Sequence, residues 1–244
     1  MEKKKNDFIA QGSILAIASI LVRVMGMIYR IPMTAIIGDK GNGFYSYAYS
    51  VYTILLLLSS YSLPLAVSKM VSAKAQLGQW RNVKRVFICA IAFAIGIGTT
   101  FGLIVLIGAQ FFTRVFFHSE LAAIALRFMA PTILIMALLG VFRGFFQGLQ
   151  NTLPTAVSQI VEGLINAIMS VVFAYFLFDF GHGMDAAGGT TDLGYAWGAA
   201  GGAIGTGAGI SSNPVHPRNR PLDISVVPSS NVIFFNPEHA PNGP

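Results

Sequence analysis

Two arginines stand in a stretch of the chain that is otherwise almost entirely apolar. Within residues 9–31 they belong to a series of small and polar residues that recur every three or four positions: Gly12, Ala16, Ser19, Arg23, Gly26 and Arg30. At about 100° per residue, such a series falls on one face of an α-helix. A guanidinium can hold a phosphate or carboxylate through two parallel hydrogen bonds. This face therefore predicts an anion-binding site.

The rest of this helix is apolar and is expected to face lipid, as at Ile14, Leu15, Leu21, Val22 and Met25. A charge within a bilayer needs a partner, because an unpaired one costs at least a few kcal/mol. For Arg23 several partners stay open: an anionic lipid headgroup, Glu162, the carbonyls of a broken helix, or the outer interface, which the side chain would reach by snorkelling. For Arg30, which lies just before Pro32, snorkelling is the favoured interpretation.

A matching polar face is expected on the helix at 154–178. Five residues lie on one face at helical spacing: Thr155, Ser158, Gln159, Glu162 and Asn166. Glu162 stands about two turns into the apolar run. A carboxylate at that depth is a candidate cation or proton site, or the counter-charge of an arginine, and a plain structural ion pair is the alternative. Gln159 and Asn166 are candidates for substrate contact beside it.

Hydroxyl groups gather on a third expected helix, at 44–67. They include Ser46, Tyr49, Ser50, Thr53 and Ser60. Ser50 and Thr53 are candidates for contact with sugar or water. The favoured alternative is that these hydroxyls bond to their own backbone, which is common for serine and threonine in membrane helices.

The composition explains where these side chains must be held. Hydrophobic residues make up 54% of the chain and charged residues 11%, against roughly 25% charged in soluble domains. The apolar residues form runs of about 20, the length that crosses a bilayer. The sequence predicts an all-α membrane protein with about six spans, at 9–31, 44–67, 86–112, 121–147, 154–178 and 194–210. The last is rich in glycine and alanine and is short for a span, and the row Gly140, Gly144 and Gly148 predicts close helix packing.

Basic residues predict the orientation. Three lysines precede the first span, and five basic residues follow the second: Lys69, Lys74, Arg81, Lys84 and Arg85. Basic residues in short loops stay on the cytoplasmic side. We therefore expect a multi-pass protein of a bacterial cytoplasmic membrane, with residues 1–8 and the loop after the second span in the cytoplasm.

The last part of the chain has another composition. Seven of the eleven prolines lie between Pro214 and Pro244, and the segment 211–244 reads as a polar, disordered tail. A truncated or frame-shifted product is the preferred explanation, and a natural proline-rich tail is the alternative.

Several classes of function are disfavoured by the sequence. It has no G-x-x-x-x-G-K-[ST] phosphate loop, no H-E-x-x-H zinc pair and no G-x-S-x-G elbow, so we expect no enzyme, no cofactor and no metal site. The basic residues do not form a stripe with aromatic side chains, so nucleic acid is not an expected partner. Transport, if it occurs, would be driven by H⁺, Na⁺ or the membrane potential.

Four stretches together resemble the flippases of the stage V sporulation protein B type, which belong to the superfamily of multidrug, oligosaccharidyl-lipid and polysaccharide exporters. They are RVMGMIYRIPM, GDKGNGFYSYAYSVY, LPLAVSKMVSAK and FRGFFQGLQNTLPTAVSQIVE. The resemblance implies about fourteen helices in two lobes, a cationic central cavity and alternating access. It also implies an undecaprenyl-linked wall precursor or polysaccharide unit as cargo, with Arg23 in contact with its pyrophosphate.

The resemblance covers about residues 8–209, so 9–210 is expected to form one lobe and the second lobe is missing. Gly163 and Asn166 stand where glutamine and arginine are expected in relatives, which removes an arginine partner for Glu162 within its own helix. Besides the flippase, two alternatives stay open: a cation-coupled multidrug exporter, and a membrane fragment without transport function.

Overall fold

The computed structural model describes residues 2–60, 62–188 and 192–211, and all of its elements are helices. They are α1 (Glu2–Ser60), α2 (Leu63–Gln76), α3 (Trp80–Phe117), α4 (Ala122–Gly148), α5 (Leu153–Gly188) and α6 (Leu193–Ser211). The described ranges contain no strand. The expected all-α membrane fold is confirmed, whereas the predicted tail after Ser211 lies outside the described residues.

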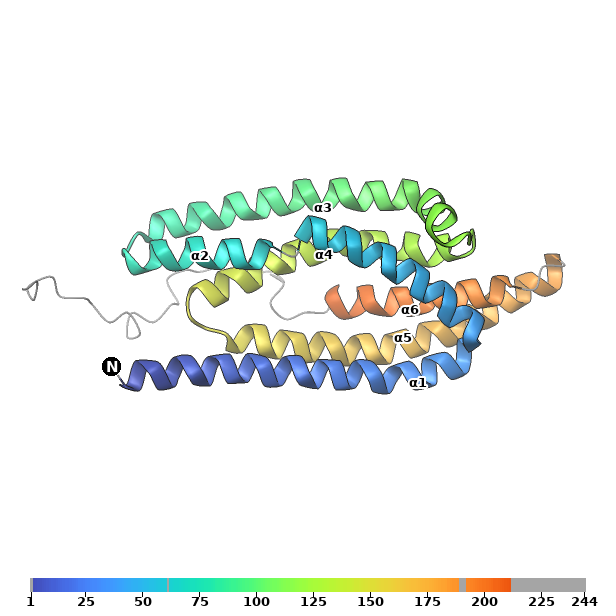
Figure 1. The fold of residues 1–244 in the computed structure, drawn as a ribbon, viewed down its shortest axis with the longest axis horizontal. Helices are drawn as coiled ribbons and strands as arrows, with labels where there is room; N and C mark the ends of the chain where they lie inside the picture. Colours follow the sequence, from blue (N-terminus) through green and yellow to red (C-terminus); the bar gives the residue numbers. More distant parts are fainter. Residues whose placement is uncertain (1, 61, 189–191, 212–244) are drawn as a thin grey trace, which may run out of the picture.

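Four stretches of the described chain are long and apolar enough to cross a membrane: Gly12–Gln76, Trp80–Phe117, Ala122–Gly148 and Leu153–Ala186. The first contains both of the spans expected at 9–31 and 44–67, because α1 folds back on itself (Figure 1). The bend is at Gly38, whose φ of 64° and ψ of −178° lie in a region that is essentially open to glycine alone.

Two of the predicted helix ends were wrong. Pro32 does not end the first helix, which continues to the bend at Gly38. The second span was expected to run to residue 67, but α1 ends at Ser60 and α2 begins at Leu63, with Pro64 in its first turn. A proline is well accepted there, because the first N–H groups of a helix have no partner within the helix.

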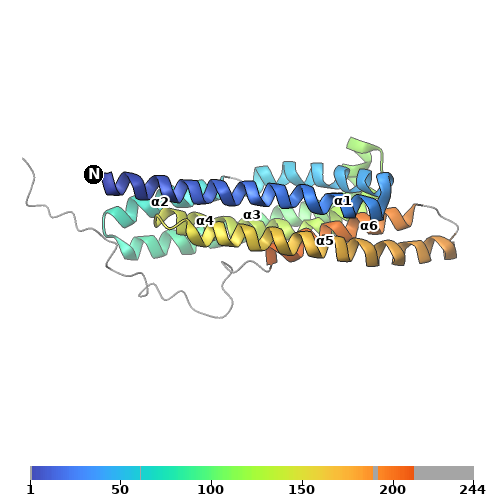
Figure 2. The same ribbon diagram turned by 90° about the horizontal axis from the view of Figure 1, so that it is seen from below.

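The helices run back and forth along one long axis (Figures 1 and 2). The start of α1, the link from α2 to α3 and the link from α4 to α5 lie at one end of the molecule, which we call the N-terminal end. The bend of α1, the link from α3 to α4, the end of α5 and the start of α6 lie at the other end, the bend end. The basic residues expected in the loop after the second span lie within helices instead, Lys69 and Lys74 in α2 and Arg81, Lys84 and Arg85 at the start of α3. They flank the link from α2 to α3, at the same end as the N-terminus.

Glycines set the distance between neighbouring helices. A Cβ on Gly144 of α4 would lie 2.5 Å from the carbonyl oxygen of Pro64, and one on Gly148 would lie 2.8 Å from that of Ser68. The predicted packing row is thus confirmed, with α2 as its partner. On α6, a Cβ on Gly201 would lie 2.3 Å from the carbonyl oxygen of Phe173, and one on Gly205 would lie 2.2 Å from the backbone nitrogen of Ser170, both on α5. Helix α6 lies between α5 and α4 (Figure 1).

Candidate functional site

A pocket of about 170 Å³ opens between α5, α6 and the two halves of α1 that lie on either side of the bend. The first half of α1 provides Gly26, Tyr29, Arg30 and Met33, and the second half provides Tyr45 and Tyr49. The other two lining residues are Asn166 of α5 and Thr206 of α6. The pocket thus joins two of the predicted binding residues, Arg30 and Asn166, which are 136 positions apart in the chain.

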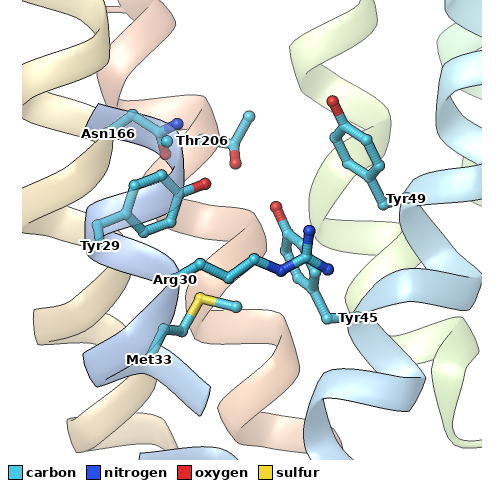
Figure 3. A pocket seen from close by; sticks show the side chains of 8 residues that line it. Tyr29, Arg30, Met33, Tyr45, Tyr49, Asn166 and Thr206 are labelled. Atoms are coloured by element: carbon cyan, nitrogen blue, oxygen red, sulfur yellow. The ribbon is translucent and has the colours of Figure 1, made fainter. Parts of the chain in front are cut away.

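Among the residues that the structure describes, Arg30 is the only charged one that lines this pocket. Its side chain extends from the first half of α1 toward the second half (Figure 3), where Nη2 donates a hydrogen bond of 3.3 Å to Oγ of Ser46. Arg30 does not stand at the end of its helix, which was expected at residue 31, because the helix continues for eight residues beyond Arg30 to the bend at Gly38. At 1.5 Å per residue this places Arg30 about 12 Å from the bend.

Three tyrosines surround the guanidinium on both sides (Figure 3). The rings of Tyr45 and Tyr49 are stacked, with centroids 5.9 Å apart and planes at 15°. Tyr45 is buried, whereas Tyr49 is 46% exposed. An aromatic face beside polar groups suits a ligand with both apolar and polar surfaces, such as a sugar ring. The sequence indicated Tyr49 only as part of a polar face, and Tyr29 and Tyr45 were missed.

Asn166 is held in place from two directions. Its Oδ1 accepts a hydrogen bond of 2.8 Å from Oγ of Ser170, which also lies 3.2 Å from the carbonyl oxygen of Gly202. A Cβ on Gly209 of α6 would lie 2.8 Å from Cβ of Asn166. The close contact of α5 and α6 therefore positions the amide at the pocket.

Glu162 forms an ion pair that the sequence analysis missed. Its Oε2 lies 2.5 Å from Nη2 of Arg143 on α4, and the two side chains are only 18% and 15% exposed. Glu162 was a possible partner of Arg23, but the structure assigns it to Arg143. Near this pair, Oε1 of Gln159 and Oγ1 of Thr155 are buried without a hydrogen-bonding partner in the described part of the chain.

Arg23 lies outside the pocket and is exposed. It forms no ion pair or hydrogen bond with the residues that the structure describes. Its depth follows from its neighbours: a Cβ on Gly163 would meet Met25 at 3.1 Å and Val22 at 3.3 Å. Arg23 is therefore at about the same depth as Glu162. Val22 and Met25 were expected to face lipid, but they face α5 instead.

Ser50 and Thr53 do not join the pocket. Their hydroxyls donate to the carbonyl oxygens of Ser46 at 2.8 Å and Tyr49 at 2.7 Å, within the same helix. The favoured alternative for these two residues, bonding to their own backbone, is confirmed.

Most of the chain is similar in sequence to known proteins. Residues 8–198 match the model of the family described as polysaccharide biosynthesis protein. The chain belongs to this family. Two of its relatives in Bacillus subtilis (strain 168), the lipid II flippase MurJ and stage V sporulation protein B, are each 26% identical to it, over 200 and 184 residues. An uncharacterised membrane protein of the same organism, YabM, is 26% identical over 185 residues.

These matches cover 78%, 75% and 75% of the chain but 37%, 36% and 34% of the respective relatives. This polysaccharide biosynthesis family member thus spans little more than a third of the length of these relatives. No solved structure matches the chain. The family match includes α1 to α5 and ends within α6, so every element that lines the pocket lies wholly or partly inside it.

Proposed function

We propose that this chain forms a phosphate-binding lobe of a flippase, which moves lipid-linked cell-wall precursors or polysaccharide units across the cytoplasmic membrane. The observation that carries the proposal is the Arg30 guanidinium in a pocket between α1, α5 and α6. The name of one relative, lipid II flippase, and the family description, polysaccharide biosynthesis protein, support this role.

The pocket combines the two kinds of group that such a headgroup requires. A guanidinium binds phosphate oxygens through paired, charge-assisted hydrogen bonds. The rings of Tyr29, Tyr45 and Tyr49 offer apolar faces to a sugar, and Asn166 and Thr206 offer polar contacts. Because Arg30 makes one hydrogen bond of 3.3 Å to Ser46, most of its donors are available to a ligand.

The proposed orientation has the N-terminal end in the cytoplasm, because the basic residues of α2 and of the start of α3 flank the link at that end. Arg23 and Arg30 are both exposed, and in a two-lobe transporter a facing lobe would cover them. Alternating access would then expose the bound headgroup to one side of the membrane and then to the other. Movement of an anionic cargo would be driven by H⁺, Na⁺ or the membrane potential, without an enzymatic step.

A binding measurement tests the phosphate site directly. The full chain in lipid nanodiscs is titrated with inorganic pyrophosphate and with farnesyl pyrophosphate, a short isoprenoid of the same headgroup chemistry. We expect Arg30→Gln to weaken the binding of both about tenfold, since a hydrogen bond to a charged group contributes about 1.5–3 kcal/mol. Arg127→Gln, which removes an exposed arginine of α4 outside the pocket, serves as the matched control and should leave both affinities unchanged. Equal affinities for Arg30→Gln and the parent would refute the proposal.

The three tyrosines also favour a second candidate, a multidrug exporter, because aromatic pockets bind planar cationic drugs. The two proposals differ in the effect of the arginine. For an exporter, Arg30→Gln should strengthen the binding of ethidium, because it removes a repulsive positive charge. For the flippase lobe, ethidium should bind weakly to both proteins.

A further inference from the structure

The ion pair between Arg143 and Glu162 lies outside the Arg30 pocket. It connects α4 to α5 close to the N-terminal end, five residues before the last residue of α4 and nine residues after the first of α5. The proposed function makes no use of it. A pair with side chains 15% and 18% exposed is costly to desolvate and adds little stability by itself. Its presence therefore needs another explanation.

The guanidinium of Arg143 is only partly used. Glu162 accepts from Nη2, while Nε of the same group is buried and has no hydrogen-bonding partner among the described residues. An N–H group left in that state costs about 1–3 kcal/mol. Nε and one Nη nitrogen form the edge of a guanidinium that binds oxyanions through two parallel bonds. That edge has one bond satisfied and one available.

Two more buried side chains on α5 have an oxygen atom without a hydrogen-bonding partner among the described residues. Gln159 lies about one turn and Thr155 about two turns before Glu162 on the same face of α5. Oγ1 of Thr155, a fully buried side chain, and Oε1 of Gln159 have no partner in the described ranges. Most buried polar atoms in folded proteins are hydrogen-bonded. Among the described residues, both α4 and α5 thus carry buried polar atoms whose hydrogen-bonding capacity a polar ligand could satisfy.

The position of the pair relates it to the other arginines. Gly163 contacts Val22 and Met25, so Arg143 and Arg23 lie at about the same level along the molecule. Arg30 lies seven residues beyond Arg23, which is about 10 Å farther along α1. A headgroup that moves from the N-terminal end toward the Arg30 pocket would pass this level first.

We propose that Arg143 is the anion-binding group of a second site, which takes a phosphate or pyrophosphate before the Arg30 pocket does. In the free protein the Glu162 carboxylate acts as an internal substitute for this anion. The incoming oxyanion takes Nε and Nη2 together and displaces Glu162. The identity of the anion as a lipid headgroup rests on the proposed function, whereas the existence of the site does not.

Substitutions of the two partners distinguish this site from a structural ion pair, because they should change affinity in opposite directions. Glu162→Gln keeps the shape of the side chain but removes the competing charge. It should bind inorganic pyrophosphate about tenfold more tightly, since it removes a charge-assisted hydrogen bond that the ligand must break. Arg143→Gln should bind it about tenfold more weakly. Arg127→Gln, an exposed arginine of the same helix, should match the parent.

Two further measurements keep the result interpretable. The double variant Arg143→Gln, Glu162→Gln leaves no unpaired buried charge, so it should unfold at about the temperature of the parent and still bind as weakly as Arg143→Gln. Titration with farnesyl pyrophosphate identifies the source of the anion. If farnesyl pyrophosphate binds more tightly than inorganic pyrophosphate, and the variants rank in the same order, the anion is a lipid headgroup. If the two compounds bind with equal affinity, the anion is free pyrophosphate or phosphate.

The proposal is overturned if Glu162→Gln binds no better than the parent while both single variants only lower the unfolding temperature. In the Arg30→Gln background the same comparison separates the two sites. If the opposite effects of Glu162→Gln and Arg143→Gln persist there, the second site stands whatever the outcome for the Arg30 pocket. If Arg30→Gln alone has an effect, only the proposed function survives.

Discussion

Replacing Gly205 by alanine should separate α6 from α5. A Cβ at this position would lie 2.2 Å from the backbone nitrogen of Ser170, 2.2 Å from its Oγ and 2.3 Å from its Cα. Two of these atoms belong to the backbone, so a change of side-chain rotamer cannot relieve the overlap. Ordinary contacts begin near 3.4 Å, and α6 must therefore move away by about an ångström.

The movement has a cost in packing and in hydrogen bonds. Overpacking of a close contact costs about 1–3 kcal/mol. Alanine recovers up to about 1 kcal/mol through its higher helix propensity. The shift would also stretch the contact of 3.2 Å between Oγ of Ser170 and the carbonyl oxygen of Gly202. We expect a net loss of about 1–3 kcal/mol, together with a displacement of Thr206 from the pocket.

Thermal unfolding in detergent, followed by tryptophan fluorescence, measures this loss, because Trp197 lies on α6 itself. Gly96→Ala is the matched control: this glycine of α3 has nothing within 4 Å of its Cβ position, so it should unfold at or slightly above the temperature of the parent. The reasoning would be refuted if Gly205→Ala were as stable as Gly96→Ala.

Three further substitutions test the bend end of the molecule. Gly38→Ala should lose about 1–3 kcal/mol, since an alanine is strained at a φ of 64° and a ψ of −178°, whereas Gly43→Ala, which has open space around its Cβ position, should be neutral in the same unfolding assay. Asp185→Ala should lower the free energy of unfolding by about 1–2 kcal/mol, because this carboxylate accepts hydrogen bonds of 3.0 and 2.8 Å from the first N–H groups of α6. Lys40→Met should have no measurable effect on the unfolding temperature, because its ion pair with Asp192 is exposed to solvent.

Hydropathy predicted the helices whose ends coincide with a change in composition. The helix expected at 121–147 is α4 (Ala122–Gly148), and the one expected at 194–210 is α6 (Leu193–Ser211). The helix expected at 86–112 is longer in the structure, because α3 extends from Trp80 to Phe117. Its additional turns contain basic and polar residues, which a helix tolerates where it leaves the apolar layer, so an apolar run underestimates its length.

The bend of α1 was beyond the reach of the same reasoning. Pro32 is the stronger helix breaker in soluble proteins, yet α1 continues through it, past the end expected at residue 31. In a membrane helix a proline is tolerated, because neighbouring groups satisfy the freed carbonyl. Gly38 turns the chain instead, and one glycine among the 26 in the sequence gives no sign of a positive φ.

In the candidate site, too, the sequence predicted relations within one helix but not relations between helices. Helical periodicity placed Arg23 and Arg30 on one face of α1, and Asn166 with Glu162 on one face of α5, because it relates residues of a single helix. It could not reveal that Arg30 and Asn166 share a pocket, or that Tyr45 returns to that pocket after the bend. Those relations depend on how the helices pack against one another, and close contacts at glycines help to set that packing.

Arg143 illustrates what the sequence does contain but periodicity overlooks. Only residues 149–152 connect α4 to α5, and a connection of this length makes two helices antiparallel neighbours at the joined ends. Arg143, five residues before the end of α4, and Glu162, nine residues after the start of α5, can then meet. Pairing spares each of them an unpaired charge in the apolar layer, but it does not explain why two charges are placed there. That the resulting pair leaves Nε of Arg143 without a partner is the part that only coordinates reveal. It is also the part that turns an ordinary ion pair into a candidate binding site, because an internal ligand that satisfies half of a guanidinium edge can be displaced by one that satisfies all of it.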